Sequence, residues 1–344
     1  MRKAAKFSAG LLIAVFFLWL VLRNIDIREV IAYMQGISYW WLAPYTIVAI
    51  LSHYIRSERW RLLVKRQGIE HQRNTLFAGV MVGYLINYAV PRLGEVSRSV
   101  YVAQKTEMST SDVLGTVVLE RVIDFACMLV LVGWVVVYIV TDMATLQRLF
   151  GEETFAYLNW LGEWQQLFGL ILLAITGLLL IYLGYLAIKV WRKKSETGRR
   201  IAERIEGALK NFIYGLTAIF RMKNWPAFVI STILIWLGYA LMAYIPFTAF
   251  GLTTEYGLGF TQALVVMIIS AIGVALPSPG GVGTYHWFVT QTLVVLYSVP
   301  VTIGIAYAFV THAVMMILVV VFTPIIVLLN TGGKINLSFI RRSL

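Results

Sequence analysis

One cysteine, four histidines and few charged residues occur among the 344 residues of this sequence. The single thiol, Cys127, excludes an intramolecular disulfide and a cysteine-based metal cluster. The histidines do not show HExxH or a similar spacing, so we predict neither a metal site nor a cofactor. Charged residues make up 13% of the chain, about half the fraction in soluble domains, and hydrophobic residues make up 59%. This composition excludes a soluble domain and indicates an all-α polytopic membrane protein.

The apolar residues form segments long enough to cross a bilayer, which takes about 20 residues. We predict six spans, near residues 7–22, 40–55, 117–140, 167–189, 226–250 and 302–329. The first follows a basic N-terminus, as in a signal peptide, but no small-residue cleavage site follows it, so we expect a retained span. Two further apolar stretches, 75–90 and 260–276, each end at a proline or glycine, which interrupts a helix.

Basic residues outnumber acidic ones by 29 to 17, and the excess lies mainly in predicted loops and at the termini. Residues 56–73 carry six Lys or Arg against two acids, and residues 189–223 carry ten against three. Residues 141–164 carry four acids and one Arg, and 251–259 carry only Glu255. The positive-inside rule therefore places the first two segments and both termini in the cytoplasm, at a cell (inner or plasma) membrane. No basic domain stands apart from the spans, so nucleic acid is excluded as a partner.

Two basic segments, 53–67 and 189–212, have the composition of amphipathic surface helices. Lysine and arginine near a bilayer are attracted to anionic headgroups of the cytoplasmic leaflet. We therefore expect both segments to lie on that leaflet.

The charge assignment turns the two interrupted stretches into hairpins. Residues 75–112 begin and end in the cytoplasm, and residues 260–299 begin and end outside, so both hairpins are re-entrant and face opposite ways. The sequence INYAVPRLGEV (86–96) also matches IGVALPSPGGV (272–282) at five of eleven positions. We therefore predict an inverted-topology repeat, with one half in residues 1–160 and the other in residues 161–344.

The first hairpin carries charges close to hydrocarbon, where ionisable groups are costly and are candidates for function. The candidate residues are Asn87, Arg92, Glu95 and Arg98, with Pro91 and Gly94 as a structural hinge. Arginine presents a planar fork that suits phosphate oxygens, and a helix restarting after Gly94 aims free N–H groups at an anion. Glu95 either orients an arginine or accepts a proton. The alternative is an interfacial loop whose charges reach water.

A second charged group, in the sequence LERVIDF, begins a predicted span. Glu120 and Asp124 are four residues apart and share one helix face, and Arg121 lies next to Glu120. Charges at this depth pair with one another or with the first hairpin. The group therefore either binds substrate or holds helices together, and the two roles are compatible.

The second hairpin, LPSPGGVGTYHWF, contains no charged residue. Pro277 and Pro279 prevent a regular helix, and we interpret them as a hinge. Three glycines leave backbone groups free to bind a polar moiety or let helices pack closely; they are Gly280, Gly281 and Gly283. His286 and His312 are the nearby groups that titrate near neutral pH, with a purely structural, hydrogen-bonded role as the alternative.

The ordered motifs NYAVPRLGEVSR, ERVID and PSPGGVG make the chain resemble the lysylphosphatidylglycerol synthase transmembrane-region family. This family includes the flippase half of the multiple peptide resistance factor and stand-alone flippase-like proteins. The resemblance implies a membrane protein that moves or binds a lipid or lipid-linked anion. It points to Pro91, Gly94, Glu95, Arg98, Glu120, Arg121, Asp124, Pro279, Gly280, Gly281 and Gly283. His286 and His312 stand where the family often has an acid and an arginine. The sequence carries no soluble aminoacyltransferase segment, so we expect that this chain does not synthesise lysylphosphatidylglycerol.

Our functional hypothesis is a flippase or transporter of an anionic phospholipid or a polyprenyl-phosphate-linked lipid, and not an enzyme. Arg92, Arg98 and Arg121 receive the phosphate near the midplane. Glu95, Glu120 and Asp124 tune these arginines. One alternative is an embedded lipid-modifying transferase or hydrolase with Glu95 and His286 as acid and base. The other is a non-transporting scaffold for a lipid synthase, and a homodimer or a synthase partner stays open.

Overall fold

The computed structural model describes residues 2–23, 25–65, 73–90, 92–106, 108–142, 196, 199, 200, 203, 206, 207 and 222–331. The chain divides into two compact units, Met1–Arg121 with Asn224–Leu344, and Val122–Lys223. The predicted boundary between two repeats near residue 160 is a different kind of division and stays a prediction. The account below concerns the first unit.

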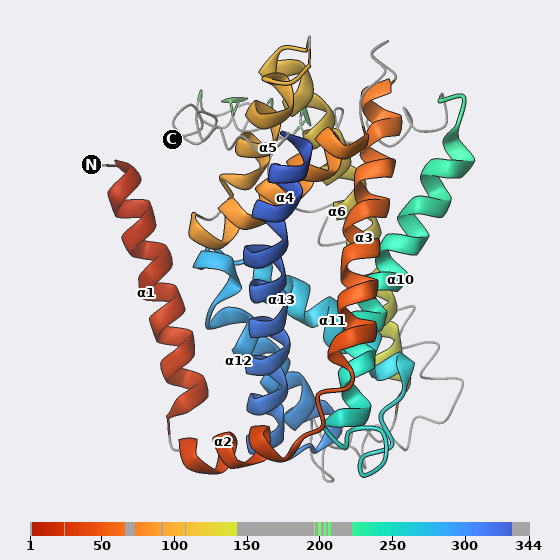
Figure 1. Cartoon of the computed structure of the whole chain (residues 1–344). Helices are drawn as coiled ribbons and strands as arrows, with labels where there is room; N and C mark the ends of the chain where they lie inside the picture. Colours follow the sequence, from red (N-terminus) through yellow and green to blue (C-terminus); the bar gives the residue numbers. More distant parts are fainter. Residues whose placement is uncertain are drawn as a thin grey trace. The chain divides into compact units, whose positions relative to one another are not determined.

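The regular elements that the structure describes are helices, which confirms the predicted class for this part of the chain (Figure 1). The longer ones are α1 (Arg2–Leu22), α2 (Ile27–Gly36), α3 (Leu42–Lys65), α4 (Arg73–Ala89), α5 (Gly94–Ala103), α6 (Thr110–Thr141), α10 (Trp225–Ala249), α11 (Phe260–Ala275), α12 (Thr284–Gln291) and α13 (Val301–Asn330). A 3₁₀ turn at Pro279–Gly281 precedes α12, and a π-helical segment at Thr292–Leu296 follows it. Helix α6 begins in the first unit and continues into the second.

Three described helices are long and apolar enough to cross a membrane, namely Thr110–Ile139, Trp225–Ala249 and Val301–Asn330. They correspond to three of the predicted spans. Helix α1 and the following α2, which turns from it by 83°, add a fourth if the bent pair is counted as one span. Helix α3 covers residues 42–55 of predicted span 40–55 but continues to Lys65 with charged residues. Predicted span 167–189 lies outside the described residues. The total of six spans stays a prediction.

The first broken hairpin consists of α4 and α5, which pack closely against each other. A Cβ at Gly83 would lie 3.2 Å from the carbonyl oxygen of Gly94, and Gly79 lies against Val102. Because Gly83 and Gly79 pair with positions in reverse order, the two helices are antiparallel. The amide of Gly94, at the start of α5, donates to Oδ1 of Asn87 at 2.7 Å. Asn87 therefore caps the helix that follows the break.

The second broken hairpin consists of α11 and α12, joined by a tip that is rich in glycine. A Cβ at Gly273 of α11 would lie 3.1 Å from the carbonyl oxygen of Thr284, so a glycine again stands at a close helix contact. Gly280, Gly281 and Gly283 have φ of 57°, 80° and 82°. These left-handed angles explain why the tip requires glycines, since a side chain would add strain at each position.

Helix α13 relates the two hairpins to each other. At its C-terminal end, Asn330 accepts a hydrogen bond from Thr75 at the start of α4 and donates one to Tyr101 near the end of α5. Close to its N-terminal end, Gly304 packs against Thr290 of α12. The open ends of the two hairpins therefore lie toward opposite ends of α13, as can be followed in Figure 1.

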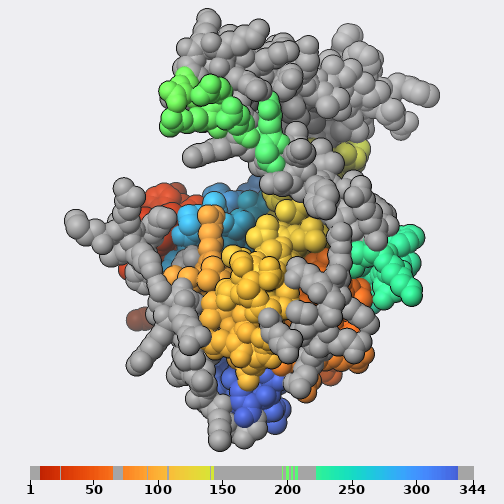
Figure 2. All heavy atoms as spheres, turned by 90° about the horizontal axis from the view of Figure 1, so that it is seen from above, coloured from red at the N-terminus to blue at the C-terminus, as the bar shows by residue number. Residues whose placement is uncertain are grey.

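The tips of both hairpins meet halfway along α13. Nε2 of His312 lies 2.9 Å from the carbonyl oxygen of Gly280, and the His312 ring lies 6.2 Å from that of Tyr88, one residue before the end of α4. Figure 2 looks onto the end of the unit where α5 and the residues after it lie beside the end of α13. The two breaks in the chain thus come together beside α13 in the first unit.

Candidate functional site

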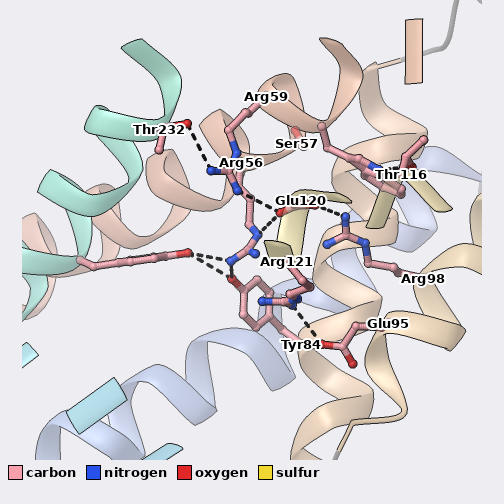
Figure 3. Close-up of polar contacts among 12 residues, drawn as sticks. Arg56, Ser57, Arg59, Tyr84, Glu95, Arg98, Thr116, Glu120, Arg121 and Thr232 are labelled. Atoms are coloured by element: carbon pink, nitrogen blue, oxygen red, sulfur yellow. Dashed lines mark hydrogen bonds and ion pairs between the residues drawn. The ribbon is translucent and has the colours of Figure 1, made fainter. Parts of the chain in front are cut away.

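The carboxylate of Glu120, on α6, holds three arginine side chains (Figure 3). Its Oε1 accepts from Nε of Arg56 at 2.7 Å and from Nη2 of Arg59 at 3.3 Å. Its Oε2 accepts from Nη2 of Arg98. We call these four residues the arginine cluster. It joins three helices, because the arginines come from α3 and α5 and the acid comes from α6.

The arginine cluster is fully internal. Each of its side chains exposes 5% or less of its surface: 5% for Arg56, 3% for Arg98, and 0% for Arg59 and Glu120. Three guanidiniums against one carboxylate give these four side chains a formal charge of +2. Ionised groups are expensive to remove from water, so a burial of this kind is maintained by close pairing and by partners that share the charge.

Hydroxyl groups from other helices complete the surroundings of the two α3 arginines. Nη1 of Arg56 donates to the hydroxyls of Tyr84 at 2.8 Å and Tyr239 at 2.9 Å. Nη1 of Arg59 donates to Oγ1 of Thr232 at 3.3 Å. Helices α4 and α10 therefore also contribute to the cluster, which brings the first broken hairpin and a membrane-length helix to the same point.

An aromatic ring supports the third arginine. Cζ of Arg98 lies 4.0 Å from the centre of the Trp60 ring, a favourable cation–π distance. Nε1 of Trp60 donates to Thr116 at 2.8 Å, which fixes the ring. Nε of Arg98 is buried and has no hydrogen-bond partner among the described residues. Arg98 is thus held in place on one side while one donor is left available.

The residues predicted from the sequence divide between this cluster and other places. Arg98 and Glu120 meet in it, whereas Arg121 pairs with Glu95 at 3.1 Å in a partly exposed ion pair. Arg92 is exposed at the break, with φ of 64°. Asn87 caps α5 instead of facing the cluster. Pro91 lies outside the described residues, and Asp124 is a partly exposed residue of the second unit.

Sequence reasoning missed Arg56 and Arg59. The expectation that residues 53–67 lie on the membrane surface is wrong for the described part, 53–65, which continues α3 into the interior. The physical reason is Glu120, whose charge compensates arginines that composition alone assigns to a surface. One available signal was the run from 42 to 65, which contains no glycine and has its single proline at the third position, as an uninterrupted helix allows.

The candidates of the second hairpin gather at its tip. The amide of Gly283 donates to Nδ1 of His286 at 3.1 Å, and Nε2 of His286 lies 3.3 Å from Nδ1 of His312. Nε2 of His312 lies 2.9 Å from the carbonyl oxygen of Gly280. The tip also packs on α1, since a Cβ at Gly10 would lie 2.8 Å from the carbonyl oxygen of Pro277.

The remaining tip residues have structural positions. Pro279 starts the 3₁₀ turn and Gly281 is buried within it. In the part of the chain that the structure describes, three or more metal-ligating side chains do not come together.

Several membrane-length helices, two broken hairpins and an internal ionised cluster define a multi-pass membrane protein. The family model described as "Lysylphosphatidylglycerol synthase TM region" matches residues 7–322. This chain belongs to that family, which confirms the resemblance drawn from its motifs.

Two curated relatives were found. The UPF0104 membrane protein MJ1595 of Methanocaldococcus jannaschii is 28% identical over 151 residues, which cover 43% of this chain and 45% of the relative. Glycosyltransferase AglD of Haloferax volcanii is 24% identical over 333 residues, which cover 89% of this chain and 51% of the relative. The matches thus span about half the length of these relatives. No solved structure matches the chain.

Proposed function

We propose that this protein is a flippase or transporter of an anionic phospholipid or a lipid-linked anion. The observation that carries the proposal is the arginine cluster, whose three buried guanidiniums share one carboxylate. A phosphate group complements such a site in both charge and shape, because its oxygens match the arginine fork. The unused Nε donor of Arg98 gives the phosphate a first point of contact.

A route for the headgroup follows from the two hairpins. Helix α5 contains 10 residues, and α12 with the π-helical segment that continues it contains 13, so the two are about 15 and 20 Å long, short of the roughly 30 Å hydrocarbon core. We propose that both hairpins re-enter the bilayer from opposite sides, as an inverted repeat in a cell membrane with both termini cytoplasmic. Irregular backbone at membrane depth lies where protein or a wet cavity satisfies it. The headgroup passes along these tips while the acyl chains stay in lipid.

Polar and aromatic side chains line the distance between the cluster and the tips. The ring of Tyr84, which binds Arg56, lies tilted against the ring of His53, with 4.5 Å between the ring centres. His53 is buried, and neither of its ring nitrogens has a hydrogen-bond partner among the described residues. One helical turn further along α4, Tyr88 faces His312. Rocking of the two halves about this line would give access to each side in turn.

Translocation by reconstituted protein tests the proposal. The full chain is placed in liposomes with a fluorescent anionic phospholipid, and transfer between leaflets is followed by quenching of the outer leaflet. Arg98→Ala should slow transfer about tenfold or more, because a charge-assisted hydrogen bond to the phosphate is lost. Arg61→Ala is the control, since Arg61 pairs with Glu58 away from the cluster. Equal rates for wild type and a folded Arg98→Ala protein contradict the assignment.

A second candidate is a lipid-linked sugar transferase, which the match to Glycosyltransferase AglD favours. The acid and base considered from the sequence have separate partners here, since Glu95 pairs with Arg121 and His286 with His312. Product formed by purified protein from a lipid-linked sugar supports this candidate. If neither transfer nor product is found while the protein retains a lipid synthase, the scaffold role is favoured.

A further inference from the structure

Two histidines connect the tip of the second hairpin to α13 through three consecutive hydrogen bonds. We call the four residues Gly283, His286, His312 and Gly280 the histidine bridge. The contacts are Gly283 N to His286 Nδ1, His286 Nε2 to His312 Nδ1, and His312 Nε2 to the Gly280 oxygen, at 3.1, 3.3 and 2.9 Å. Both rings are buried.

The two backbone ends fix the position of every proton in the bridge. A backbone amide only donates, so Nδ1 of His286 is unprotonated and its Nε2 carries the hydrogen. A backbone carbonyl only accepts, so Nε2 of His312 carries a hydrogen and, in the neutral ring, its Nδ1 accepts. The donor of His286 therefore meets the acceptor of His312. With one proton on each ring, all three hydrogen bonds are satisfied and run in one direction.

One added proton cannot be accommodated without breaking this arrangement. If His312 takes it, two N–H groups face each other between the rings. If His286 takes it at Nδ1, that N–H faces the amide of Gly283. Either the link between α12 and α13 or the bond that closes the glycine tip must open.

The bonds that open hold the contact between the two hairpins. A Cβ at Gly280 would lie 2.5 Å from Cδ1 of Tyr88, so the tip packs directly on the end of α4. The ring of Tyr285 stacks at 5.0 Å on His312, and its hydroxyl lies 3.0 Å from Thr311 Oγ1. Opening the bridge therefore loosens the place where both chain breaks converge.

No carboxylate or ammonium group competes with the bridge for a proton in the segments around it. Residues 8–22 of α1, 74–90 of α4 and 256–331 contain no Asp, Glu, Lys or Arg. The titratable groups that face it are Tyr88 from α4 and Tyr285 from α12. Of the groups that face one another here, the two imidazoles are thus the ones that an added proton would charge.

We infer that the histidine bridge is a proton-binding site, and that binding of a single proton releases the tip of the second hairpin from Tyr88. Its use in driving lipid transfer rests on the proposed function. The proton-binding step itself does not.

Magic-angle-spinning NMR of the full chain in bilayers tests the proton-binding step. The protein has four histidines, so ¹⁵N-histidine labelling and single His→Gln variants assign each ring. At pH 8 both bridge histidines should carry hydrogen on Nε2, and acidification should add one proton to the pair. An Nδ1–H tautomer in either ring at pH 8, or independent protonation of both rings, overturns the inference. His71→Gln is the control outside the bridge.

Hydrogen exchange tests the release of the tip. After correction for the intrinsic pH dependence, the Gly283 amide and its neighbours should exchange about three- to tenfold faster in acid, once the bridge has taken up its proton, than at pH 8. In the double variant His286→Gln/His312→Gln neither side chain takes up a proton, so this pH dependence should disappear. Equal pH dependence in the variant and the wild type overturns the release.

Transport separates this inference from the proposed function. In liposomes with an imposed proton gradient, wild-type transfer should respond to the gradient, and transfer by His286→Gln/His312→Gln should not. If the wild-type transfer rate does not depend on the proton gradient, the coupling of proton binding to lipid transfer is overturned, and the flippase proposal stands. If no lipid is transferred under any condition while NMR shows the single-proton site, the flippase proposal fails and the site stands.

Discussion

At the scale of residues, Glu120 decides whether three arginines remain inside the protein. Its partners Arg56 and Arg59 are 64 and 61 positions away in the sequence, and Arg98 is 22 away. Ionisable residues within apolar sequence made Glu120 and Arg98 predictable. The α3 arginines were not predictable, because their burial depends on a carboxylate from a distant helix, and local sequence does not show which helices become neighbours.

Glu120→Gln should expose the anion requirement of the cluster. The amide leaves three buried guanidiniums without their carboxylate, and breaking a buried ion pair costs about 3–5 kcal/mol. We expect a lower Tm that phosphatidylglycerol partly restores and phosphatidylcholine does not, measured by thermal unfolding in each lipid.

Glu58→Gln is the matched control, because Glu58 pairs with Arg61 in a more exposed position, where such pairs contribute about 0–1 kcal/mol. A loss of stability in Glu120→Gln that is the same in both lipids indicates that the cluster only holds the helices together.

At the scale of elements, the two helix breaks were predictable from proline and glycine, and in the structure α4 ends at Ala89 before α5 begins at Gly94, and α11 ends at Ala275 before α12 begins at Thr284. The helices of the first unit agree with the apolar segments because long runs of such residues have one low-energy arrangement in lipid. The contacts of the tips were beyond prediction. Tyr88 meets Gly280 across 192 positions, and no local pattern encodes which tyrosine a glycine touches.

Gly280→Ala should destabilise the protein through this contact. Alanine disfavours the φ of 57° that Gly280 adopts. Its methyl group would also collide with the ring of Tyr88. We expect a loss of about 1–3 kcal/mol, seen as a lower Tm. Gly115→Ala, in a helix with open space around it, should be neutral or stabilising by up to about 1 kcal/mol. Equal effects of the two substitutions would show that the tip is not packed as described.

At the scale of the whole molecule, the membrane topology remains the largest prediction. Loop charges were sufficient to propose it because positively charged residues are retained on the cytoplasmic side. Two of the six basic residues counted in 56–73, Arg56 and Arg59, are internal in the structure. The remaining count is four basic against two acidic residues, so the sign of the argument is unchanged.

Single cysteines in a Cys127→Ser background test the two hairpins. Arg73→Cys and Lys105→Cys lie at the open end of the first, and Thr254→Cys and Ser298→Cys flank the second; all four positions are exposed. An impermeant maleimide should label the first two from the cytoplasmic side and the last two from the other side. Labelling of positions 73 and 105 from opposite sides would make the first hairpin an ordinary crossing.

Asn330 attaches the C-terminal end of α13 to the first hairpin. Its carboxamide binds both helices of the first hairpin, by accepting a hydrogen bond from Thr75 and donating one to Tyr101. His312 on the same helix binds the tip of the second hairpin. The two attachment points lie eighteen residues apart on α13, a distance of about 27 Å along the helix. Because α13 contacts both hairpins, a displacement of α13 along its axis would change its contacts with the two hairpins together.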